Sequence, residues 1–180
     1  MNNKYSHIET ERLILREWQW GDISQAVEGL NNFNVAKNIL ISFPYTEKDA
    51  KDFIGKRIVE PNNKKNLYFA VTLKETGEVI GGIAIRVSEE NVVSGGIWLN
   101  ERYHRQGYGP EAWRARTKFC FDILKVKHIE DGYLTGNEPS WKMQSRMGYK
   151  ANGEGEKNCP ARGGATKEFK TILTRENFIE

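Results

Sequence analysis

The chain has 180 residues, which is enough for one domain with a sizeable core and too few for two domains of typical size. Apolar residues make up 38% and charged residues 28%, and no apolar run approaches the roughly 18 residues that a membrane-spanning helix needs. The net charge of +3 comes from 27 basic and 24 acidic residues that are well mixed along the chain, which excludes the basic stripe of a typical nucleic-acid-binding surface. We therefore expect one soluble, cytoplasmic domain over residues 1–180, with neither nucleic acid nor membrane as a partner.

The first hundred residues predict both helices and strands. Asp22 and Gln25 stand at capping-box spacing before an amphipathic stretch, and Thr46 can cap a second helix. Short polar turns separate the three apolar runs that follow, which is typical of an antiparallel meander. The predicted order is a strand, two helices and three strands, at residues 12–18, 21–30, 46–60, 66–73, 79–87 and 92–100.

The remaining residues continue the mixed pattern. Apolar residues recur at three- and four-residue spacing from Trp113 to Leu124, which indicates a helix that faces the sheet. The predicted elements are a helix, a strand, a short helix, a glycine-rich loop and a late strand, at residues 111–125, 128–135, 137–148, 151–165 and 168–174. The order predicts a mixed α/β (α+β) fold, with a central, largely antiparallel sheet of six or seven strands and about four helices.

Two cysteines, Cys120 and Cys159, lie far apart in the chain. They lack CxxC or Cys/His spacing, so the pattern indicates neither a disulfide framework nor a zinc site. We expect two free thiols and no bound metal.

Gly107 and Gly109, in the stretch "RQGYGP", stand between the predicted strand 92–100 and the predicted helix 111–125. The start of a helix presents unpaired backbone amides and the positive end of the helix dipole, and glycine lets an anion approach the backbone closely. The pattern matches neither G-x-x-x-x-G-K-[ST] nor the dinucleotide fingerprint. It indicates either another kind of phosphate cradle or a simple tight turn, and Pro110 suits the first helical turn in both cases.

Four stretches of the chain resemble the GNAT superfamily of acetyl-CoA-dependent N-acetyltransferases. "HRQGYG" at residues 104–109 is similar to the family signature Q/R-x-x-G-x-G/A, and "NEPSWKMQSRMGY" at residues 137–149 is similar to the later N-x-x-S motif. The opening "ETERLILREWQWGDI" and the ending "TILTRENF" resemble the branch that includes ribosomal-protein alanine acetyltransferases. The order and spacing of the four stretches over residues 9–178 argue against a chance match.

The resemblance implies that acetyl-CoA is the acyl donor. The family binds the donor's pyrophosphate on backbone amides of the glycine loop, and the pantetheine adds beside the splayed end of the preceding strand. His104 and Pro110 depart from the signature, so one or two contacts are expected to weaken while the backbone amides remain. The residues that the resemblance places in donor binding are Trp98, Leu99, Asn100, Arg105, Gln106, Gly107, Tyr108, Gly109 and Asn137.

Direct transfer to an amine requires a group that hydrogen-bonds or protonates the leaving thiolate. Many family members present a tyrosine at this position, but here the position is Gln144, so Ser140 becomes the catalytic candidate. Asn137 and Ser140 also suit an ordinary helix cap, and this alternative stays open.

The general base is open as well. Glu89, Glu90 and Glu101 are expected in a turn or at a strand end, where carboxylates are typically surface charges. His104, which is next to Arg105, is also more typical of a surface residue. A proton relayed through water is an equal alternative.

The acceptor cleft is expected between residues 31–45, which link the first two helices, and the strand 92–100. Its candidate residues are the aromatic Phe33, Phe43, Tyr45 and Trp98, for which core packing is the alternative. A protein N-terminus, a small amine and an amino acid are all possible acceptors. We therefore expect an acetyl-CoA-dependent N-acetyltransferase, as a monomer or homodimer. The alternative is a module of the same fold that binds acyl-CoA or acts as a scaffold without turnover.

Overall fold

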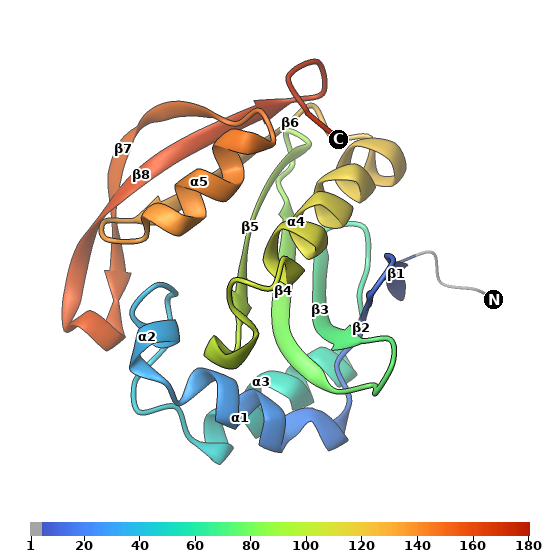
Figure 1. Ribbon diagram of the computed structural model, residues 1–180, viewed down its shortest axis with the longest axis vertical. Helices are drawn as coiled ribbons and strands as arrows, with labels where there is room; N and C mark the ends of the chain where they lie inside the picture. Colours follow the sequence, from blue (N-terminus) through green and yellow to red (C-terminus); the bar gives the residue numbers. More distant parts are fainter. Residues whose placement is uncertain (1–4) are drawn as a thin grey trace.

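The computed structural model, which describes residues 5–180, contains one eight-stranded sheet in the order β1-β2-β3-β4-β5-β6-β8-β7 (Figure 1). Neighbouring strands are antiparallel except β5 and β6, which are parallel. The strands are β1 (His7–Glu9), β2 (Leu13–Glu17), β3 (Asn66–Leu73), β4 (Val79–Val87), β5 (Val92–Leu99), β6 (His128–Leu134), β7 (Lys150–Cys159) and β8 (Gly164–Thr174). The predicted mixed, largely antiparallel architecture is confirmed, but the predicted strand count of six or seven is too low.

Helices cover both faces of the sheet, and there are five α-helices in the described chain rather than about four. Helices α1 and α3 pack against one another and α1 contacts β4, whereas α4 contacts β1, β2 and β5, and α5 contacts β6. Each face has its own apolar core, and β3 serves both because Phe69 and Ala70 point to opposite sides. The helices are α1 (Ile23–Leu30), α2 (Phe33–Ala36), α3 (Glu47–Val59), α4 (Tyr108–Phe119) and α5 (Glu138–Arg146).

The two predicted helix caps had different outcomes. Thr46 caps α3 as expected, since its side chain accepts from the Asp49 amide and Asp49 accepts from the Thr46 amide. Asp22 precedes α1 but makes no side-chain cap; its carboxylate instead pairs with Arg16 at 2.8 Å. The side-chain oxygen of Gln25 accepts from the Val79 amide at 3.2 Å. Asp22 Oδ2 also accepts from the Gln19 amide at 2.8 Å, so the carboxylate bonds to Arg16 and to the turn before α1 rather than to α1 itself, and the prediction of a box with Gln25 was wrong.

The prediction of a loop at residues 151–165 was also wrong, because most of this segment forms β7 and the start of β8. Almost every residue of β7 is exposed, so the strand lacks the apolar alternation that identifies a half-buried strand in a sequence. Its conformation comes from pairing with β8 at the sheet edge, with a bulge where Gly153 has a φ of +97°. The other strand that the pattern missed, β1, lies at the opposite edge and has three residues.

A buried ion pair connects α4 to the centre of the sheet. The Arg116 guanidinium donates two hydrogen bonds to the Asp131 carboxylate of β6, at 2.7 and 3.1 Å, and both side chains are at most 1% exposed. The Tyr149 hydroxyl donates to the same carboxylate at 3.0 Å. Burial alone would lower the pKa of Arg116, but the charge of Asp131 raises it above its usual range. Arg116 therefore remains a buried cation.

This ion pair lies where β5 and β6 stop pairing. The parallel pairing of the two strands is limited to Val92 opposite His128 and Val93 opposite Ile129. Two residues further along each strand are Gly95 and Asp131, and a Cβ on Gly95 would come within 2.7 Å of an Arg116 nitrogen. The same Cβ would lie 2.0 Å from the Ala84 carbonyl oxygen of β4, so this carbonyl and the guanidinium together leave room only for glycine.

The two cysteines are free, as expected, and the structure places both in buried positions. Burial raises the pKa of the Cys120 thiol to about 12, so it is not a reactive thiolate at neutral pH. Within residues 5–180, no helix has the length and apolar character that crossing a membrane requires. The same span holds no group of three or more His, Cys, Asp and Glu side chains placed to bind a metal ion.

Asp131→Asn preserves the shape of the side chain but leaves the buried Arg116 charge without its partner. Because removal of one member of a buried pair costs about 3–5 kcal/mol, we expect a loss of that size in the free energy of unfolding measured in urea. Glu89→Gln is the control, since Glu89 pairs with Lys65 at the surface and should leave the midpoint nearly unchanged. An Asp131→Asn protein that unfolds at the parent midpoint would contradict this role of the pair.

Candidate active site

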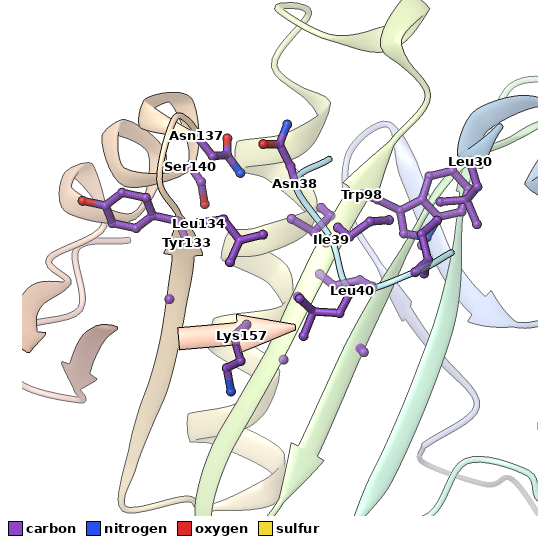
Figure 2. A pocket seen from close by; sticks show the side chains of 18 of the residues that line it. Leu30, Asn38, Ile39, Leu40, Trp98, Tyr133, Leu134, Asn137, Ser140 and Lys157 are labelled. Atoms are coloured by element: carbon purple, nitrogen blue, oxygen red, sulfur yellow. The ribbon is translucent and has the colours of Figure 1, made fainter. Parts of the chain in front are cut away.

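A cavity of about 450 Å³ lies at the opening between β5 and β6. Beyond Val93 and Ile129 the two strands do not pair, and no strand of the described chain pairs with this edge of β5. Figure 2 shows Asn137 and Ser140 at one end of the cavity and Trp98 at the other, with Ile39 between them. The cavity therefore joins the two faces of the sheet through the opening between the strands.

The predicted glycine loop leads from β5 into α4. Gly107 is the residue before the helix and has a φ of +86°, a conformation that glycine adopts at little cost. The first turn of α4 begins with Tyr108, Gly109 and Pro110. The backbone amides of Tyr108 and Gly109 therefore have no intrahelical partner and lie at the positive end of the helix dipole. The arrangement is compatible with an anion site, and the phosphate cradle remains a prediction.

Arg12, at the end of the loop before β2, fixes the glycine loop from outside. Its Nη1 donates to the Gln106 carbonyl at 3.1 Å, and its guanidinium lies 4.4 Å from the centre of the Tyr108 ring. Its Nε donates to Glu111 of α4 at 2.7 Å, and the Thr10 hydroxyl donates to the same carboxylate at 2.6 Å. Partial burial opposes ionisation of Glu111, but these hydrogen bonds and the Arg12 charge keep its pKa low. The loop is thus held by contacts that leave its amides available.

On the α5 side, a chain of three side chains leads to the cavity. The Thr171 hydroxyl of β8 donates to Gln144 Oε1 at 2.6 Å, and Gln144 Nε2 donates to Ser140 Oγ at 3.0 Å. Gln144 and Thr171 are each 1% exposed, whereas Ser140 is partly exposed and lines the cavity. Since Ser140 Oγ accepts from Gln144, its own hydroxyl hydrogen is free to point elsewhere. Gln144 therefore holds the Ser140 oxygen in place, and the Ser140 hydroxyl is left able to donate a hydrogen bond.

The opposite face of the cavity is apolar and aromatic. Tyr45 and Trp98 line it, together with Trp18, whose ring stacks on Trp98 at 6.4 Å. Gly82 makes room for this arrangement, because a Cβ there would lie 2.6 Å from the Trp98 indole nitrogen. Burial, with a smaller effect of Asp49, raises the pKa of Tyr45 to about 12, so its hydroxyl remains a hydrogen-bond donor. Residues 38–41 complete this wall.

The family model described as an acetyltransferase (GNAT) domain matches residues 12–150, well over half of the chain. The chain belongs to the GNAT acetyltransferase family. It is an N-acetyltransferase, as the sequence predicted.

Individual proteins agree with this assignment. The uncharacterized N-acetyltransferase YnaD of Bacillus subtilis (strain 168) is 29% identical over 155 residues, which cover 86% of this chain and 88% of YnaD. Two solved structures share the fold at a TM-score of 0.79. One is the ribosomal-protein-S5-alanine acetyltransferase from Vibrio fischeri, at 17% identity over 97% of this chain and 99% of the other. The second is spermidine N-acetyltransferase from Vibrio cholerae in complex with CoA and spermine, at 14% identity over 95% and 100%.

In this acetyltransferase, four of the predicted site residues line the same cavity: Tyr45, Trp98, Asn137 and Ser140. Residues 105–109 do not line the cavity but form the loop before α4 and its first turn, and Leu99 and Asn100, also outside the lining, are buried where β5 ends. Asn100 is partly engaged elsewhere, since its Oδ1 accepts from the Arg102 amide at 3.3 Å. His104 donates to the Leu99 carbonyl at 2.9 Å and is likewise a structural residue of this junction.

Phe33 and Phe43 lie outside the cavity lining. Their rings contact one another at 5.5 Å, and the two residues are 47% and 38% exposed. The segment that carries them does border the cavity, but through residues 38–41 rather than through these two rings. A role for Phe33 and Phe43 in acceptor binding remains a prediction.

None of the three carboxylates considered as a base lines the cavity. Glu89 pairs with Lys65, and Glu90 is exposed. Glu101 accepts hydrogen bonds from the Asn32 and Asn34 side chains at 2.7 and 3.0 Å, and the bond from Asn32 is the main reason that its pKa is lowered. The cavity instead contains Glu168 of β8, which the sequence analysis did not select.

Gly107→Val tests the glycine loop. Its side chain would be strained at a φ of +86°, and its Cβ would lie 3.1 Å from an Arg12 nitrogen, so the loop would have to shift and we expect acetyl-CoA affinity to fall at least tenfold in calorimetry. Gly163→Val is the matched control, because Gly163 has a φ of +83°, open space around it and a place in the β7–β8 turn. Both variants should lose about 1–2 kcal/mol of stability, but only the first should lose affinity. If Gly107→Val bound acetyl-CoA as tightly as the parent, the prediction that this loop binds the donor's pyrophosphate would be wrong.

Proposed function

We propose that this acetyltransferase uses acetyl-CoA as its acyl donor and transfers the acetyl group directly to a primary amine. The observation that carries the proposal is the cavity that crosses the sheet between β5 and β6, where β5 leads through the glycine loop into α4. A donor and an acceptor that enter from opposite faces can meet in such a cavity without a covalent enzyme intermediate. The V. cholerae neighbour, whose structure holds CoA and spermine together, supports a ternary complex in this fold.

The donor is expected to lie along β5 and the glycine loop. The free amides of residues 105–109 suit the pyrophosphate, and the unpaired edge of β5 near Trp98 and Leu99 suits the amide groups of pantetheine. Asn137 lines the cavity just before α5, where its side chain makes no capping hydrogen bond. Its amide is therefore available to the donor, which weakens the alternative that Asn137 is only a helix cap.

Ser140 is expected to assist the leaving group. Its Oγ accepts from Gln144 instead of bonding to a backbone amide of α5, so it does not act as a cap. A thioester supplies a carbonyl carbon open to attack and a thiolate that leaves once the amide bond forms. Ser140 would donate its hydroxyl hydrogen to that sulfur, and Gln144 would hold the serine oxygen in place.

Calorimetry and thiol release test the proposed donor and reaction together. We expect acetyl-CoA to bind in the micromolar range, which is about −8 kcal/mol. Acetyl-CoA should release free CoA thiol when mixed with a panel of amines: an alanyl peptide, a seryl peptide, L-lysine and spermine. Absence of binding at millimolar acetyl-CoA would refute the proposal. Binding without thiol release from any amine would favour a non-catalytic acyl-CoA-binding module.

Ser140→Ala separates chemistry from structure. Loss of one donor to the leaving group should lower kcat by about ten- to several-hundredfold while acetyl-CoA affinity changes little. Ser145→Ala is the matched control, because Ser145 is on the same helix but bonds to the Lys142 carbonyl and does not line the cavity. Steady-state kinetics and a thermal melt on both variants give the comparison. A normal kcat in Ser140→Ala would exclude the proposed role.

A further inference from the structure

Glu168 is the one carboxylate among the described residues that line the cavity. We propose that Glu168 binds the amino group of the acceptor and takes the proton that this group must lose before it attacks the thioester. The inference rests on the proposed function and identifies the base that this function requires.

The carboxylate of Glu168 lies in a niche made by two glycines. A Cβ on Gly132 of β6 would be 2.8 Å from one carboxylate oxygen, and a Cβ on Gly155 of β7 would be 3.7 Å from the other. Any other residue at position 132 would displace the carboxylate. The side chain of Glu168 is 14% exposed, and no residue within 5–180 donates a hydrogen bond to it. A carboxylate this enclosed normally has donors, so its oxygens are available to a ligand in the cavity.

The alternation of β8 places Glu168 on the acceptor side of the sheet. Phe169 stacks on Tyr133, which stacks on Trp141 of α5, and Thr171 bonds to Gln144 of α5. Residues at even positions of this strand therefore point away from α5. Glu168 faces one side of the opening and Ser140 the other, so an amine held by Glu168 would approach the thioester opposite the leaving-group donor.

Basic groups surround the niche. The Lys157 ammonium of β7 lies 3.8 Å from the carboxylate, and the Lys170 side chain covers Gly155. The β6 residues opposite Lys170 and Glu168 are Gly132 and Leu134, neither of them charged. Arg86 of β4 and Lys157 are the two cations among the described residues that line the cavity. The position of Lys157 shows that a primary ammonium fits beside Glu168, and its distance is too long for a hydrogen bond.

The protons balance in this arrangement. The acceptor ammonium gives one proton to Glu168, and the nitrogen lone pair then forms the new C–N bond as the C–S bond breaks. The second nitrogen proton is lost to solvent and a proton from solvent converts the departing thiolate to the CoA thiol, while Ser140 keeps its proton and donates a hydrogen bond to the sulfur. Glu168 passes its proton to solvent before the next cycle.

Glu168→Gln preserves the shape of the side chain and removes the base. For panel amines that the parent acetylates, we expect kcat/KM to fall about a hundredfold or more, with acetyl-CoA affinity within twofold of the parent. The loss should be larger for the lysine side-chain amine, with a pKa of about 10.4, than for a peptide N-terminus at about 7.7–8.0. A role in folding alone would not produce this dependence on the acceptor. In calorimetry with CoA-loaded protein, which cannot turn over, the variant should bind these amines at least tenfold more weakly.

Glu156→Gln is the matched control, because Glu156 is an exposed carboxylate of the neighbouring strand β7 and does not line the cavity. Glu168→Asp is the second variant if the glutamine protein does not fold; it keeps the charge but withdraws it from the niche, so kcat/KM should fall at least tenfold. Parent-like kcat/KM and amine affinity in a folded Glu168 variant would overturn this inference and leave the proposed function intact. A parent that releases no thiol with any amine would overturn the proposed function instead, and with it the reaction for which Glu168 is needed.

Discussion

A buried ion pair between two diverging strands is the constraint on which the site depends. Neighbouring parallel strands normally continue to pair, since every unpaired backbone group that is buried costs free energy. Here the Arg116 guanidinium fills the space beyond Val93 and Ile129 and bonds to Asp131. Two buried charges are tolerated only as a pair, so α4, β5 and β6 are held in one relative position. The opening between the strands, and the cavity within it, follow from that position.

In the proposed reaction, the groups on the two sides of the opening have different roles. The glycine loop, held by Arg12, lies at the start of α4, and Ser140 lies on the α5 side with Gln144 behind it. The aromatic wall with Tyr45 and Trp98 lies on the face of α1 and α3. The proposed direct transfer needs an amine that approaches one face of the thioester carbonyl and a donor that is held near the sulfur, and two walls fixed to different faces of one sheet can position these groups separately.

Features that depend on neighbouring residues could be predicted from the sequence. Gly107 was expected at a strand-to-helix turn, and its φ of +86° is a property that glycine alone adopts readily. The Thr46 cap and the helices after it depend on contacts within one turn. Edge strand β7 could not be predicted in this way, because its polar sequence has no alternation and only the pairing with β8 makes it a strand. The Asp22 cap failed because Arg16, six residues away, competes for the carboxylate.

The sequence was therefore sufficient for most strands and helices and for the positions of the glycine loop and of Asn137 and Ser140 at helix starts, all of which are encoded by short-range patterns. The tertiary structure alone showed that Thr171 bonds to Gln144, and that Glu168 enters the cavity while Phe33 and Phe43 do not. Thr171 and Gln144 are 27 positions apart, and their contact depends on the register of β8. A shift of one residue in that register would exchange the two faces of the strand and move Glu168 away from the cavity. No local pattern specifies such a register, because it is set by packing of the whole sheet against its helices.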